Sequence, residues 1–88
     1  MSQLQKLLLS LLSGRGDQNI RFADLLTLLD YFEFDVRIKG SHHIYTRADV
    51  VEITNLQPVS GMAKPYQVRQ VRELVVKYKL TIKEYGDE

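Results

Sequence analysis

The spacing of the apolar residues changes at Phe34, and this change limits the folds open to the chain. Upstream, in residues 22–32, apolar side chains recur every three or four residues, which is typical of an amphipathic helix. Downstream, in residues 34–39, apolar and charged side chains alternate, which is typical of a strand with one buried face. The helical stripe is Phe22, Leu25, Leu26, Leu29 and Phe32, and the apolar strand positions are Phe34, Val36 and Ile38. The chain therefore combines helices and strands in separate segments.

The remaining segments continue this division. Leucines at helical spacing predict a further helix over residues 3–12. We predict two more strands over 42–47 and 50–56, then a loop over 57–64, and Pro65 suits the first turn of a final helix over 65–78. We therefore expect an α+β fold in which three antiparallel strands form a meander. The helices at 22–32 and 65–78 pack on one face of this sheet, against the apolar face of the first strand.

The Gly-Ser pair at 40–41 forms the predicted turn between the first two strands. Glycine supplies the positive φ that a tight two-residue hairpin needs. In that register Lys39 lies opposite His42 and Ile38 lies opposite His43, and opposed residues share a face of the sheet. We therefore expect His43 on the helix-facing side and His42 on the open side. A slip of one residue would exchange the two roles.

Composition excludes several kinds of chemistry. The chain has 88 residues, enough for one small domain, and it has no cysteine, which rules out disulfides, thiolate metal sites and thiol nucleophiles. The net charge of +1 does not by itself indicate a nucleic-acid partner, so that argument depends on local clustering. The apolar run at 7–12 is too short to span a bilayer. We expect a cytoplasmic protein without membrane contact.

His42 and His43 are the only histidines, and histidine is the side chain best suited to proton transfer near neutral pH. Neighbours on a strand point to opposite faces, so we predict no metal site and no cofactor. Arg37 and Lys39 share the open face with His42, where they would attract a phosphodiester. His42 is therefore the candidate general base or acid. The alternative is a solvated or structural histidine, and Ser41 is better explained as a turn residue than as a nucleophile.

These motifs resemble the HicA toxin family. The resemblance covers about residues 20–80 and rests on Phe34, the run IKGSHHIY at 38–45, a short strand, a Pro-containing loop and the final amphipathic helix. It implies a fold like that of a double-stranded-RNA-binding domain, with the order α-β-β-β-α. It also implies a ribosome-independent mRNA interferase that is neutralised by a HicB antitoxin. The family's catalytic histidine follows the Gly-Ser pair, which corresponds to His42.

Two features depart from the family pattern. Typical members begin near residue 20, so we divide the chain into an N-terminal helical extension and linker (1–19), a HicA-like domain (20–80) and a C-terminal tail (81–88). Many members carry a second histidine in the loop after the third strand, and residues 57–64 contain none. Two other functions therefore stay open: an RNA-binding module without catalysis, and a protein-interaction domain that uses the leucine-rich N-terminal helix.

Most of the predicted RNA contacts are basic side chains. Lys39 would stabilise negative charge at the phosphate, and the start of the final helix would contact phosphates through its basic residues, Arg72 included. For Arg69 the alternative is an ordinary solvated charge ladder with Glu73 and Lys77. The residues that we predict to bind RNA are Arg37, Lys39, Gly40, Ser41, Lys64 and Arg69.

Overall fold

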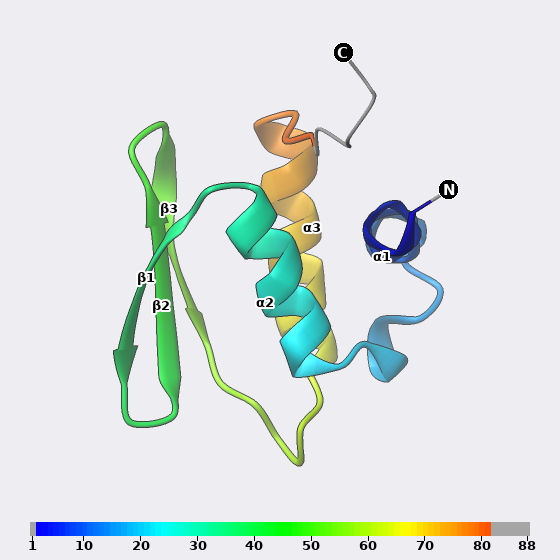
Figure 1. Ribbon diagram of the computed structural model, residues 1–88, viewed down its shortest axis with the longest axis horizontal. Helices are drawn as coiled ribbons and strands as arrows, with labels where there is room; N and C mark the ends of the chain where they lie inside the picture. Colours follow the sequence, from blue (N-terminus) through cyan, green and yellow to red (C-terminus); the bar gives the residue numbers. More distant parts are fainter. Residues whose placement is uncertain (1, 82–88) are drawn as a thin grey trace.

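The helices and the sheet form three layers. The elements are α1 (Gln3–Ser13), the short 3₁₀ helix η1 (Asp17–Asn19), α2 (Phe22–Tyr31), β1 (Asp35–Lys39), β2 (His42–Arg47), β3 (Val50–Leu56) and α3 (Pro65–Lys77). The computed structural model describes residues 2–81, so residues 82–88 of the predicted tail lie outside the described part. The sheet forms one layer, α2 and α3 cover one of its faces, and α1 lies on the far side of this helix pair (Figure 1). The α+β prediction is confirmed, with element bounds that agree within one residue.

Local signals set the helix ends. The side chain of Ser2 accepts a hydrogen bond from the backbone N–H of Gln5 at 3.1 Å, which caps the start of α1. The same helix ends at Gly14, whose φ of +73° is the left-handed conformation common after a last helical turn. Pro65 occupies the first turn of α3, and Asp24 lies in the first turn of α2. Each helix therefore begins or ends where the sequence provides a reason.

The strands form an antiparallel meander in the order β1-β2-β3. Lys39 pairs with His42 and Ile38 pairs with His43, so the register that the two-residue turn predicts is confirmed. Gly40 has a φ of +59°, the conformation that the turn requires of its first residue. The two histidines consequently lie on opposite faces of the sheet.

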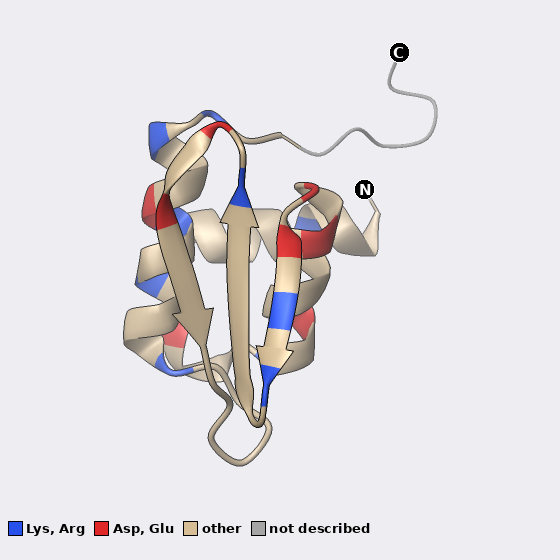
Figure 2. Cartoon of the chain, turned by 90° about the vertical axis from the view of Figure 1, so that its left-hand side faces the viewer, with Lys and Arg blue, Asp and Glu red and all other residues tan. Residues whose placement is uncertain are grey.

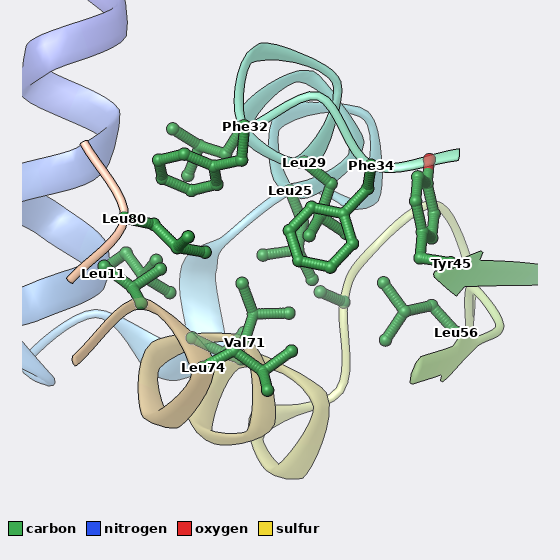
Figure 3. Close-up of a cluster of buried hydrophobic side chains, with 14 of the residues drawn as sticks. Leu11, Leu25, Leu29, Phe32, Phe34, Tyr45, Leu56, Val71, Leu74 and Leu80 are labelled. Carbon is green, nitrogen blue, oxygen red and sulfur yellow. The ribbon is translucent and has the colours of Figure 1, made fainter. Parts of the chain in front are cut away.

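One hydrophobic core joins the three layers (Figure 3). It extends from Leu11 of α1, through the facing sides of α2 and α3, to Tyr45 and Leu56 of the sheet. Val36 and Ile38 lie outside it and are 44% and 59% exposed, so the expectation that the helices cover the apolar face of β1 is wrong. The buried side chains of the sheet come from β2 and β3, and β1 is an edge strand that extends past the helices.

Arg72 holds α1 and η1 against α3. Its guanidinium donates to both carboxylate oxygens of Asp17, at 2.8 and 3.0 Å, and both side chains are mostly buried. It also donates to the backbone carbonyl of Leu11 at 3.0 Å, in the last turn of α1, where carbonyls lack helical partners. The hydrogen bonds to Asp17 raise the pKa of Arg72 further above its ordinary range. The prediction that Arg72 contacts phosphates is therefore wrong, because the fold uses its donors.

We expect Arg72→Ala to lower the free energy of unfolding by about 3 kcal/mol, because it leaves the mostly buried carboxylate of Asp17 without its partner. Urea denaturation measures this loss. The control is Arg69→Ala, which truncates an exposed arginine of the same helix and should cost less than about 0.5 kcal/mol. Equally small losses in both variants would show that the pair does not hold α1 in place.

Glu52 fastens the edge strand β3 to the end of α3. Its carboxylate accepts hydrogen bonds from Lys77 Nζ at 2.7 Å and from the Tyr78 hydroxyl at 2.6 Å. That hydroxyl in turn accepts from the backbone N–H of Val51 at 3.2 Å, which occupies a donor on the strand edge. Lys77, followed by Tyr78, lowers the pKa of Glu52 from 4.5 to about 2. Lys77 therefore forms its ion pair with Glu52 of the sheet, and not with Glu73 in a charge ladder along α3.

The Glu52 carboxyl has a lower pKa in the folded protein than in the unfolded chain. The stability that this carboxylate adds to the fold is therefore fully present above pH 4.5 and is lost as the pH falls towards 2. We expect Glu52→Gln to melt at a lower temperature near neutral pH, and to lose less stability than the wild type between pH 4.5 and 2. Tyr78→Phe should reduce the same pH dependence in part. Parallel melting-temperature curves for the wild type and Glu52→Gln would contradict this account.

Candidate functional site

The candidate site lies at one end of the molecule, which we call the hairpin end. It comprises the turn at 40–41, the first residues of β2, the loop at 57–64 and the start of α3. These segments lie together at the lower end of the molecule in Figure 1, where α2 also begins. Residues that are far apart in the sequence therefore meet at this end.

A path of hydrogen bonds ties the turn to α3. Gln57 Nε2 donates to Ser41 Oγ at 3.1 Å, and the backbone carbonyl of Gln57 accepts from Gln67 Nε2 at 3.0 Å. Gln67 Oε1 then accepts from the backbone N–H of Lys64 at 3.1 Å. Gln67 is fully buried, so both of its polar atoms need such partners. The path fixes Ser41 relative to the start of α3.

His42 lies on the open face of the sheet and is exposed. Its Nδ1 lies 3.1 Å from Oδ1 of Asn55, which comes from the same face of β3. Lys39 is its direct cross-strand partner on β1. The structure thus brings together an imidazole and an amide that contacts one of its ring nitrogens, with a lysine at the paired position of the neighbouring strand.

His43 has a different environment. Its ring packs edge-on against Phe22 of α2, with ring centres 5.2 Å apart and an angle of 75° between the planes. Its Nδ1 lies 3.4 Å from the backbone carbonyl of Ser41. His43 is half-buried, whereas His42 is exposed, so the predicted division between a packed and a presented histidine is confirmed.

The basic side chains of β1 line a shallow hollow on the open face. The hollow has a volume of about 380 Å³, and its lining includes Arg37, Lys39, Ile44 and Ile53. Figure 2 shows the two basic positions of β1, one near the middle of the strand and one towards the hairpin turn. Asp35 lines the same hollow at the start of β1, so the positive charge of Arg37 and Lys39 is concentrated in the half of the strand that leads to the hairpin turn.

The other predicted contacts lie on or before α3. Lys64 precedes the first turn of α3, and its ammonium group lies 5.7 Å from the ring centre of Tyr66. The path through Gln67 and Gln57 connects this segment to the hairpin turn, so Lys64 belongs to the hairpin end. Arg69 is exposed further along α3. The structure thus connects Lys64 to the hairpin turn through hydrogen bonds, whereas Arg69 lies on the exposed surface of α3.

Sequence reasoning missed Asn55, Gln57 and Gln67. A signal for Asn55 exists. Residues that share a face of a strand recur with a period of two, and counting outwards along both strands from the turn at 48–49 puts Asn55 on the same face as His42. A signal for Gln67 also exists, since it is the third residue of a helix that begins at Pro65, where a glutamine can bond back to the cap. The role of Gln57 can be recognised only in the folded chain, where it contacts Ser41 and Gln67.

Comparisons of this chain with protein-family models, with curated proteins and with solved structures find no match. The resemblance to the HicA family therefore stays a prediction. Within residues 2–81, no helix is long and apolar enough to cross a membrane. The same residues contain no group of three or more histidine, aspartate, glutamate or cysteine side chains that could hold a metal ion.

The two histidines should differ in their effects on stability. We expect His42→Ala to change the free energy of unfolding by less than about 0.5 kcal/mol, because the side chain is exposed. His43→Ala should cost about 1 kcal/mol or more, because it removes the ring that packs against Phe22. Chemical denaturation of the two variants measures the difference. A larger loss in His42→Ala would mean that the register is wrong by one residue.

Proposed function

We propose that this protein is a HicA-like toxin that binds and cleaves mRNA, with His42 as the catalytic residue. The observation that carries the proposal is the environment of His42: it is exposed, it lies opposite Lys39, and it belongs to the end of the molecule where the turn and the start of α3 meet. An exposed imidazole beside an ammonium group provides a proton acceptor and a positive charge for one phosphodiester. This arrangement would supply two of the groups that RNA cleavage uses, a base for the 2′-hydroxyl and a positive charge at the phosphate.

The architecture supports the proposal at a coarser level. The order α2-β1-β2-β3-α3, with both helices on one face of a three-stranded antiparallel sheet, agrees with the fold of a double-stranded-RNA-binding domain that the resemblance implies. In that fold the start of the second helix contacts groove phosphates. Lys64 is the N-cap residue of α3, and Arg69 lies about one turn further along the helix. We therefore propose that RNA lies across the hairpin end and contacts Arg37, Lys39, Gly40, Ser41, Lys64 and Arg69.

The proposed reaction is an internal transesterification. His42 takes the proton of the ribose 2′-hydroxyl, the 2′-oxygen attacks the adjacent phosphorus, and the bond between phosphorus and the 5′-oxygen breaks. The departing 5′-oxygen takes a proton from water, and the other product ends in a 2′,3′-cyclic phosphate. Lys39 stabilises the negative charge that gathers on the phosphoryl oxygens. With one histidine in place of an acid-base pair, slow turnover is expected, which suits a toxin that needs few cuts.

We expect His42→Ala to abolish cleavage of a single-stranded RNA while it keeps most of the RNA affinity, because the ring acts in proton transfer. Lys39→Ala should weaken binding and reduce the slope of log Kd against log salt concentration by about 0.7 to 0.9, the value of one lost phosphate contact. Gel analysis of product ends and binding at several salt concentrations measure both effects. Cleavage by His42→Ala at the wild-type rate would overturn the catalytic assignment.

A second candidate function is protein binding without catalysis. Val51 and Ile53 on β3 are 87% and 68% exposed, and adjoining exposed apolar side chains on an open sheet face are typical of interaction surfaces. A HicB-like antitoxin is the partner that the first proposal implies, in the cytoplasm and without a membrane. No RNA affinity at low salt would leave protein binding as the better explanation of this face.

A further inference from the structure

The contact between His42 and Asn55 carries a further inference. Oδ1 of Asn55 lies 3.1 Å from Nδ1 of His42, and both side chains lie on the open face of the sheet. Asn55 pairs with Ile44 in the ladder between β2 and β3, so its backbone is held by the central strand, diagonally across from His42. The amide is therefore anchored by the sheet and not by a loop.

The chemistry of the two atoms fixes the position of a proton. A side-chain carbonyl oxygen only accepts hydrogen bonds, so this contact is a hydrogen bond when the proton of the neutral imidazole is on Nδ1. Nε2 then has the free lone pair. We propose that Asn55 is a positioning residue that holds neutral His42 in the Nδ1–H form, so that Nε2 is the atom that takes up a proton.

The catalytic part of this inference rests on the proposed function. In the proposed transesterification, Nε2 would receive the proton of the 2′-hydroxyl, and the resulting imidazolium would keep its Nδ1–H bond to Asn55. The amide is neutral, so it orients the ring without adding a charge to the face where Arg37 and Lys39 would bind a phosphate. Orientation of a base by a third group is a common feature of such sites.

The experiment reads the tautomer directly and needs no RNA. Imidazole ¹⁵N chemical shifts distinguish a protonated from an unprotonated ring nitrogen, and the chain has only two histidines, His42 and His43. At about pH 8.5, well above the ordinary titration range of histidine, we expect the His42 proton on Nδ1 in the wild type. Asn55→Leu keeps the approximate size of the side chain and removes the acceptor, so the proton should shift towards Nε2. Asn55→Asp keeps an acceptor and should restore the Nδ1–H form.

His43 is the internal control, because its Nδ1 contacts the backbone carbonyl of Ser41, and its signals should not change in either variant. In the RNA assay, Asn55→Leu should lower kcat by about threefold to tenfold, the range that one neutral hydrogen bond is worth, with KM nearly unchanged. Asn55→Asp should recover most of the loss in kcat but raise KM, because its carboxylate adds a negative charge to the face that would bind the phosphate. This pattern of rescue is not expected of a residue that only stabilises the sheet.

Two results overturn the inference whatever the RNA assay gives. They are a wild-type His42 with its proton on Nε2, and an unchanged tautomer in Asn55→Leu. A wild type that shows the Nδ1–H form but cleaves no RNA has a different meaning: it overturns the proposed function and the catalytic part of this inference, while the positioning of the ring by Asn55 stands.

Discussion

The two-residue turn at 40–41 is the constraint on which the candidate site depends. Side chains alternate along a strand, so a slip of one residue would move every side chain of the hairpin to the opposite face. A two-residue turn allows one register between β1 and β2, and in that register Lys39 pairs with His42. His42 is thereby presented on the open face, while His43 packs against Phe22 of α2. One glycine with positive φ therefore gives two adjacent histidines different chemical environments.

The rest of the fold supports this hairpin. The buried amide of Gln67 links the start of α3 to Gln57, and Gln57 contacts the turn through Ser41. On the other side of the helix pair, Arg72 joins α1 to α3, and Leu11 extends the core into α1. A site built on a strand and braced by a helix holds its geometry more closely than one on a free loop. The candidate residues at the hairpin are themselves exposed, and the central strand together with the path through Gln57 and Gln67 holds them in place.

Much of this could be predicted from the sequence, because long periodic segments and a tight turn are local signals. The helices, the strands and the pairing of the first hairpin all follow from them. The errors concern tertiary placement. Val36 looks buried in the sequence but lies beyond the edge of the helices, and Arg72 looks like a phosphate ligand although its partner Asp17 lies 55 positions away. Strand alternation places Asn55 on the face of His42, but its contact with the ring follows only from the pairing of β3 with β2.

The central claim is that RNA binds at the hairpin end with His42 at the phosphate. The most direct measurement is an NMR titration of the wild-type protein with a single-stranded RNA whose 2′-hydroxyls are methylated, which binds without being cleaved. The account predicts that the shift changes concentrate at Lys39, Ser41 and His42, with the His43 ring signals nearly unchanged behind the sheet. Shift changes centred on α1, or on the His43 ring with His42 unaffected, would contradict it.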